Sequence, residues 1–278
     1  MAASTTTTLD DLFNNIIKEA IFTAQEQSLV RNLVTVYDIS GESGKTVQVP
    51  VYPEVSASAL TEGTDLSSTT VSTSSKTITV SEVGVQAILT DLAAKSANGD
   101  VAGNLGRVLG EAVAKKMDTD LIGLFSGFSA GFGSAGTEIT TADIFKAAAR
   151  LRASNATGQM AAVIHPYQAY QIKSNLTNAF ANPNGGDLQN EAMRNGYVGS
   201  IAGVDIYESS NISVDGSDDS VGAVFVPAAL GLAIKWDVNI EPQRDASLRG
   251  WELNATAAYG VGELVDSYGQ SLTFDAAV

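Results

Sequence analysis

The chain has 278 residues, 44% of them hydrophobic and 17% charged, which is enough for one large domain or two modest ones. Its formal net charge is −15, and its 16 lysines and arginines are scattered, which argues against a nucleic-acid-binding surface. The lack of cysteine excludes disulfides and thiolate metal sites. No apolar run approaches the roughly 18 residues that cross a membrane, so we expect no membrane-spanning helix. No basic residue precedes the first apolar residues, so we expect no signal peptide.

The chain opens with an amphipathic pattern. Apolar residues recur at helical spacing from Leu9 onward, and the stripe includes Phe13, Ile16, Ile17 and Ile21. A helix this short is marginal alone in water, so its apolar face must be buried against something. Two interpretations remain open, namely a core helix of the same subunit and an arm that lies on a neighbouring subunit.

A long two-stranded excursion is predicted next. Residues 45–53 alternate as a strand does, and residues 68–90 have the pattern of a second extended strand. The polar residues 56–68 form the tip between them. Pro50 suits an edge strand rather than a central one. Because an isolated hairpin is marginal in water, and this one has little apolar material, we expect it to need a partner surface.

Residues 100–125 predict a long α-helix, on which the other layers are expected to lie. Its apolar stripe comprises Val101, Leu105, Val108, Leu109, Ala112, Val113, Met117, Leu121 and Leu124. The polar side is expected to carry mainly Arg107, Glu111, Lys115, Lys116, Asp118 and Asp120. Asp118 and Asp120 fall on different faces of this spine helix, so they are not expected to form a catalytic pair of carboxylates.

Helices and strands then alternate irregularly. The expected elements are a helix over 141–154, a buried strand over 160–165, a helix opened by Pro166, strands at 204–208 and 223–226, and mostly extended chain from Leu230 to the end. This mixture without strict strand–helix–strand alternation predicts an α+β fold.

Two motifs imitate ligand sites. GESGKT, residues 41–46, resembles part of a phosphate-binding loop, but Ile39 occupies the place of the first glycine, and a strand follows instead of a helix. DGSDD, residues 215–219, spaces oxygen ligands as calcium loops do, but Val226 stands where the closing glutamate belongs. We therefore expect no cofactor site and no metal site.

His165 is the only histidine, so a Ser–His–Asp hydrolase would have to use it. No GxSxG elbow supplies a nucleophile, and His165 stands between a strand and Pro166, where a helix-capping or packing role is expected. A small hydrolase remains an alternative, as does a Ser/Thr-rich surface protein, although no secretion signal is seen. Our prediction is a protein without catalytic residues.

The order of these parts is similar to that of the major capsid proteins of tailed bacteriophages, which have the Hong Kong 97 type fold. Three segments carry the resemblance most: the spine 100–125, AAVIHPYQAYQI at 161–172, and YVGSIAGVDIYESSNI at 197–212. The resemblance covers almost the whole chain.

The resemblance implies an N-terminal arm at 1–40 and an extended loop at 41–90. It also implies a peripheral domain at 91–135 with 235–262, and an axial domain at 136–234 with 263–278. The implied function is self-assembly, as hexamers and pentamers, into an icosahedral shell around double-stranded DNA. The shell would enclose DNA without sequence-specific binding, include a portal protein and assemble in the host cytoplasm. The rival within the fold is a bacterial encapsulin shell with enzyme cargo.

Two features depart from some members of that family. Some relatives carry a scaffolding extension before the arm; this sequence shows none, so a separate scaffolding protein is expected, unless the chain is a processed form. The loop tip has no lysine for a Lys–Asn cross-link between subunits, which puts that chemistry in doubt. The expected intersubunit contacts are the arm residues Phe13, Ile16, Ile17 and Ile21, the tip residues Leu60, Glu62 and Asp65, and Asn182 and Asn184 in the loop 181–187.

Overall fold

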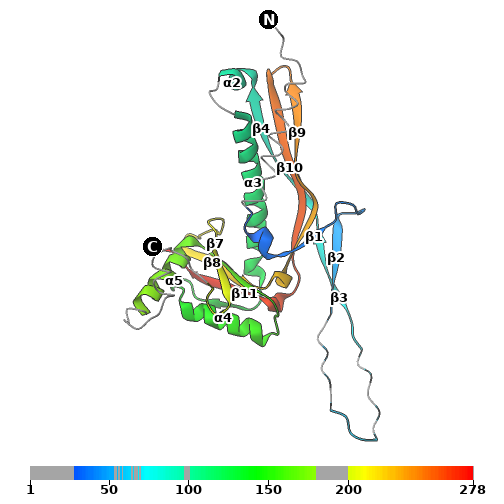
Figure 1. The fold of residues 1–278 in the computed structure, drawn as a ribbon, viewed down its shortest axis with the longest axis vertical. Helices are drawn as coiled ribbons and strands as arrows, with labels where there is room; N and C mark the ends of the chain where they lie inside the picture. Colours follow the sequence, from blue (N-terminus) through cyan, green and yellow to red (C-terminus); the bar gives the residue numbers. More distant parts are fainter. Residues whose placement is uncertain are drawn as a thin grey trace.

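The computed structural model describes residues 28–52, 70–96, 101–179 and 200–277, and between the first two ranges residues 55, 57, 59–63, 65 and 68. This part of the chain forms a four-stranded sheet, a five-stranded sheet and a two-stranded ribbon. Figure 1 shows a long helix beside the four-stranded sheet, shorter helices beside the five-stranded sheet, and the ribbon projecting away. The α+β class expected from the sequence is confirmed.

The spine helix α3 runs over Val101–Gly123, close to the expected 100–125. Its stripe residues Leu109, Val113, Met117 and Leu121 are at most 2% exposed, and they pack toward strands β4 and β10. The helix has a second buried side, which the sequence analysis did not predict, because the 3-10 turn η1 (Val30–Leu33) also packs on it.

This second contact corrects the expected helix faces. Asp118, expected on the polar side, is only 1% exposed, because it faces η1. Val108 and Ala112, expected in the apolar stripe, are exposed instead. Asp120 accepts a hydrogen bond from the Tyr259 hydroxyl at 2.8 Å, so Asp118 and Asp120 do point to different partners, as predicted.

The four-stranded sheet has the order β1-β9-β10-β4. Its strands are β1 (Thr35–Asp38), β9 (Leu230–Asp245), β10 (Gly250–Glu263) and β4 (Ser81–Thr90), and the short helix α2 (Asp91–Ser96) follows β4. β10 pairs antiparallel with both β9 and β4, whereas β1 runs parallel to β9. The side chains of β10 alternate, so that Leu253, Ala255, Ala257 and Tyr259 are buried on the α3 side.

The five-stranded sheet has the order β5-β11-β8-β6-β7. Its strands are β5 (Gly131–Gly133), β11 (Gly269–Asp275), β8 (Asp219–Phe225), β6 (Met160–Ile164) and β7 (Val204–Glu208). One face packs on α4 (Thr141–Ala153) and α5 (Pro166–Ala179), which confirms both expected helices and the role of Pro166. Every residue of β6 is buried, as predicted.

The two sheets share a core at the lower end of the spine helix. Phe125, in the 3-10 turn η2 (Phe125–Gly127), is fully buried with its ring centroid 5.5 Å from that of Phe225 on β8. Two further 3-10 turns, η3 (Pro227–Ala229) and η4 (Asp266–Tyr268), stand where the chain passes between the sheets. The long helix and both sheets are therefore joined by one hydrophobic cluster.

The ribbon consists of β2 (Thr46–Val51) and β3 (Ser74–Thr79), paired antiparallel with Pro50 opposite Ser75. Ile78, only 1% exposed, anchors it to the four-stranded sheet. A side-chain carbon at Gly231, Gly260 or Gly262 would come within 3.1 Å of atoms of Ile78. These three glycines leave the space that the isoleucine fills.

Strand pairing moves four expected boundaries. Residues 81–90 belong to the four-stranded sheet rather than to the excursion, because Val83, Val85 and Ala87 pack against the spine core. β1, placed within the arm, is also part of this sheet, and β9 enters it at Leu230 rather than at 235. β5, expected in the peripheral part, pairs with β11 in the other sheet.

Candidate functional site

His165 acts as a helix cap. Its Nδ1 accepts a hydrogen bond from the backbone N–H of Tyr167 at 3.3 Å, and its carbonyl accepts the N–H of Ala169 at 3.0 Å. The imidazole also lies edge-on to the Tyr167 ring, with the centroids 4.9 Å apart. Burial lowers the pKa of His165, so the neutral form that caps α5 is favoured. The capping role predicted from the sequence is confirmed.

Hydrogen bonds from backbone N–H groups to side-chain carboxylates stabilise the acidic turn at 215–219. Asp215 accepts the N–H groups of Ser217 at 2.8 Å and Asp219 at 3.0 Å, and these bonds hold the pKa of Asp215 below its usual value. Asp219 accepts the N–H of Gly136 at 2.7 Å. Among the described residues, no three His, Asp or Glu side chains are grouped to hold a metal ion.

No helix within the described ranges is both long and apolar enough to cross a membrane.

The tip residues predicted as contacts belong to the connection between β2 and β3, and Figure 1 shows that this ribbon projects away from the rest of the subunit. Leu60 is 66% exposed, and Glu62 and Asp65 are exposed as well. Tyr52, which leads into the tip, is 70% exposed. The stretch from 46 to 75 contains three acidic residues and no lysine or arginine. The other predicted contacts, Phe13, Ile16, Ile17, Ile21, Asn182 and Asn184, lie outside the described residues.

A second apolar surface, which the sequence analysis missed, occupies the far end of the four-stranded sheet. We call it the distal patch; it comprises Ile88, Leu92 and Leu248, which are 51%, 78% and 49% exposed. Ile88 belongs to β4, Leu92 to α2, and Leu248 to the turn between β9 and β10. An indication of Ile88 is present in the sequence. This apolar residue follows Glu82, Gly84 and Gln86, none of them a large apolar residue, on the face of β4 that points away from α3.

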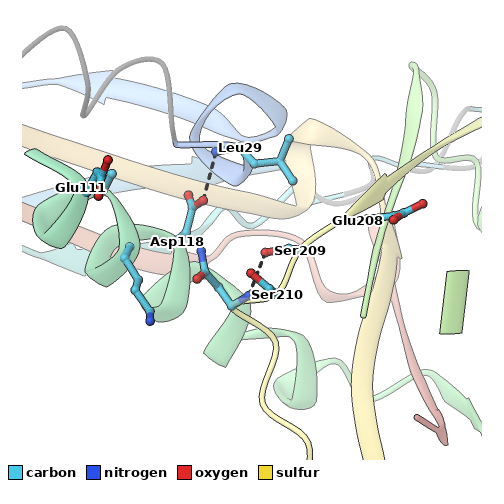
Figure 2. A pocket seen from close by; sticks show the side chains of 9 residues that line it. Leu29, Glu111, Asp118, Glu208, Ser209 and Ser210 are labelled. Carbon is cyan, nitrogen blue, oxygen red and sulfur yellow. Dashed lines mark hydrogen bonds between the residues drawn. The ribbon is translucent and has the colours of Figure 1, made fainter. Parts of the chain in front are cut away.

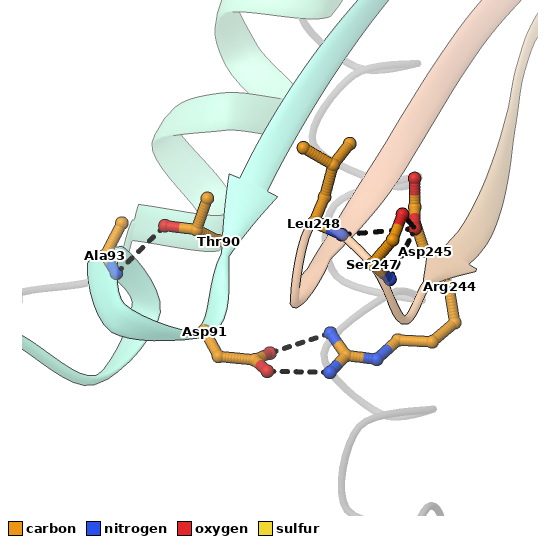
Figure 3. Close-up of polar contacts among 7 residues, drawn as sticks. All are labelled: Thr90, Asp91, Ala93, Arg244, Asp245, Ser247 and Leu248. Atoms are coloured by element: carbon orange, nitrogen blue, oxygen red, sulfur yellow. Dashed lines mark hydrogen bonds and ion pairs between the residues drawn. The ribbon is translucent and has the colours of Figure 1, made fainter.

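Polar contacts hold the backbone around the distal patch (Figure 3). Arg244 donates two hydrogen bonds to Asp91, at 2.8 and 2.7 Å, and its guanidinium lies 5.6 Å from the Trp251 ring centroid. Asp245 accepts bonds from the Ser247 hydroxyl and backbone and from the Leu248 N–H, and these hold the pKa of Asp245 below its usual value. The turn that presents Leu248 is therefore preorganised.

The described part of the chain includes two hollows. One, of about 400 Å³, is lined by residues of α3, by Leu29 and by the chain after β7 (Figure 2). The other, of about 430 Å³, lies at the root of the ribbon and includes Lys45, Lys235 and Trp236. Both linings mix acidic and basic side chains, and His165 lines neither of them. Neither hollow therefore offers the nucleophile–histidine pair that a hydrolase would need.

The described residues thus place exposed apolar side chains at the loop tip and at the distal patch. Comparison with protein families identifies the kind of protein. Residues 58–269 match the family model described as phage capsid protein. Since this covers well over half of the chain, the chain belongs to that family. No curated protein matches the sequence.

Solved structures show the same fold. A chain of mycobacterium phage Che8 is 19% identical with a TM-score of 0.71, covering 90% of this chain and 91% of that one. The capsid of cyanophage P-SCSP1u is 19% identical with a TM-score of 0.68, covering 90% and 89%. The capsid of Helicobacter pylori bacteriophage KHP30 is 14% identical with a TM-score of 0.68, covering 90% and 92%. The protein is a phage major capsid protein, a structural component of the virion shell.

Proposed function

We propose that this chain is the main subunit of an icosahedral shell of the Hong Kong 97 type, which encloses the double-stranded DNA of a tailed phage. The observation that carries the proposal is the exposure of apolar side chains at both extremes of the subunit. Tyr52 and Leu60 lie along the projecting loop, and Leu92 and Leu248 lie at the distal patch. Such surfaces are typical of proteins that bury them against further copies.

In this proposal the parts of the subunit have separate roles. Residues N-terminal to β1 form the arm, and β2 and β3 with their tip form the extended loop. The four-stranded sheet with α3 is the peripheral domain, and the five-stranded sheet with α4 and α5 is the axial domain. The axial domains gather at the centres of hexamers and pentamers, and the arm, the loop tip and Asn182 with Asn184 contact neighbouring subunits.

The net charge of −15 supports the enclosure of DNA without sequence-specific binding, because an acidic shell repels DNA that must move in and out. The other partners in this proposal are a separate scaffolding protein and a portal protein, and assembly takes place in the host cytoplasm. The subunit catalyses no reaction. The family match favours this function over an encapsulin shell.

Imaging tests the proposal directly. The full chain, co-expressed with the scaffolding protein of its phage, should give closed shells by negative-stain microscopy and by light scattering. Particles taken from infected cells should contain double-stranded DNA. Monomers alone in the presence of the scaffold would overturn the proposal, and shells filled with an enzyme instead of DNA would favour the encapsulin alternative.

A further inference from the structure

A buried carboxylate joins the spine helix to the start of the described chain. Asp118 lies in the last third of α3 and is 1% exposed. One of its oxygens accepts the Ser28 hydroxyl at 2.9 Å and the Val30 N–H at 3.3 Å, and the other accepts the Leu29 N–H at 3.0 Å. Figure 2 shows the bond to Leu29 at the edge of the first hollow.

These contacts cap η1 from a distant part of the chain. The first N–H groups of a helical turn have no partners within the turn, and a nearby side-chain oxygen usually satisfies them. Leu29, the cap residue of η1, has no side chain that can do so. Asp118, which is 88 to 90 residues away in the sequence, does it instead. The position of η1 therefore depends on the spine helix.

Other contacts also hold η1 and the strand that follows it. Val30 is fully buried in the main core, and Arg31 pairs with Asp237 of β9 at 2.8 Å. The Thr35 hydroxyl donates to the carbonyl of Pro227 at 2.9 Å, and β1 then pairs with β9. Asp118 thus holds residues 28–30, with which the described chain begins.

The carboxylate contributes the direction of its hydrogen bonds. Burial raises the pKa of Asp118, although the hydrogen bonds from Ser28, Leu29 and Val30 oppose that change. A leucine or methionine could fill the same space, but it would leave these three donors without their acceptor, which is costly for buried groups.

We propose that Asp118 is a positioning residue for shell assembly, which fixes residues 28–30, the point where the described chain begins. The inference rests on the proposed function, because the position of these residues matters for assembly only if the segment before them meets a neighbouring subunit. In a shell the same contact is repeated by every subunit, so a variable position of residues 28–30 would produce mismatched neighbours throughout.

The test compares Asp118→Ala with Asp120→Ala in the full chain. Asp120 is the control, because it lies two residues after Asp118 on the same helix. It is also hydrogen-bonded, but to Tyr259 and Lys116 rather than to η1. In the unassembled chain, Asp118→Ala should speed hydrogen exchange at the amides of Leu29 and Val30 about tenfold, since each loses a charge-assisted bond. Asp120→Ala should leave that exchange unchanged. Asp118→Asn, which keeps one acceptor oxygen, should restore part of the protection.

Assembly with the scaffold gives the second measurement. Shells of Asp118→Ala should vary in diameter and contain open or malformed particles, whereas those of Asp120→Ala should remain uniform. Unchanged exchange at Leu29 and Val30 would overturn the anchor, and uniform shells despite faster exchange would overturn its role in positioning. If Asp118→Ala does not fold, Asp118→Asn decides by the same two measurements, because it removes the charge and one of the two acceptor oxygens of Leu29 and Val30. Failure of the wild-type chain to form shells would overturn the proposed function instead, and the exchange measurement would still judge the anchor.

Discussion

The only histidine of the chain shows how position determines the use of a reactive side chain. His165 lies between a buried strand and a proline-initiated helix, where the first N–H groups need an acceptor. Its Nδ1 provides that acceptor to Tyr167. A neutral ring is required, since a protonated imidazole has two donors and no acceptor.

Replacing His165 by Ala should reduce the free energy of unfolding by about 0.5–2 kcal/mol through loss of the cap. Because burial lowers the pKa of His165 below 6.5, the unfolded chain takes up a proton first as pH falls. The stabilisation is therefore present above pH 6.5 and is lost as pH falls through the lowered pKa. Urea titrations above and below that pH should show the difference between wild type and His165→Ala shrinking on the acid side. His165→Asn should keep the cap without this pH dependence; a pH dependence as large as that of the wild type would contradict the explanation.

At the scale of elements, the ribbon is held by a contact that only glycine permits. A side-chain carbon at Gly260 would lie 2.3 Å from the carbonyl oxygen of Thr79 and 3.1 Å from Cγ2 of Ile78. The clash with the backbone cannot be relieved by a rotamer change. The direction in which the ribbon leaves the sheet therefore depends on this glycine.

Gly260→Ala should lower stability by roughly 1–3 kcal/mol, as overpacking in a core does. Thermal unfolding of the unassembled chain measures this cost. Gly41→Ala is the matched control, because a side-chain carbon there meets no atom within 4 Å. Equal midpoints for the two variants would show that the ribbon root is not tightly packed.

The distal patch gives a second prediction for an element. Leu92 is 78% exposed, so Leu92→Asp should change the stability of the unassembled chain by no more than about 0.5 kcal/mol. If the patch is buried between subunits, the added carboxylate should cost several kcal/mol per contact and prevent assembly. Light scattering with scaffold present measures the yield of shells, and Leu92→Ala should give an intermediate yield. Normal shells from Leu92→Asp would remove the distal patch from the interface.

The arm prediction separates two readings of the first residues. If Phe13, Ile16, Ile17 and Ile21 pack on a neighbour, Ile17→Asp should leave the melting midpoint of the unassembled chain unchanged and block shell formation. If they are ordinary core, the same change should lower that midpoint by many degrees, because a buried unpaired carboxylate is costly. Differential scanning calorimetry of the unassembled variant distinguishes packing on a neighbour from packing in the core. Asn14→Asp is a control on the same segment.

For the whole molecule, we predict shells without covalent links between subunits. The extended loop has no lysine at its tip, so an isopeptide bond cannot start there. Boiled particles should run on a denaturing gel as one band near 28.8 kDa. A ladder of multimers would show that lysines outside the tip, such as Lys45 or Lys76, take part in cross-linking.

The amino-acid sequence by itself determined the elements that depend on local patterns. The stripe of α3, Pro166 at the start of α5 and the apolar run of β6 each identify an element from residues a few positions apart, because helix and strand periodicities are local. The order of these elements was also sufficient for the resemblance to phage capsid proteins. The missed distal patch is different, since Leu92 and Leu248 are far apart in sequence and are brought to the same end of the sheet only by the pairing of β4 with β10.

Tertiary structure decided the contacts between distant segments. Asp118 has the helical position of a polar surface residue when only its own helix is considered, yet η1 buries it and supplies its donors. The strand pattern of residues 81–90 fits the extended excursion equally well, and only the pairing of β4 with β10 places it in the four-stranded sheet. Periodicity gives the direction in which each side chain points, but not which element lies opposite, because that depends on the shapes and unpaired groups of segments far along the chain.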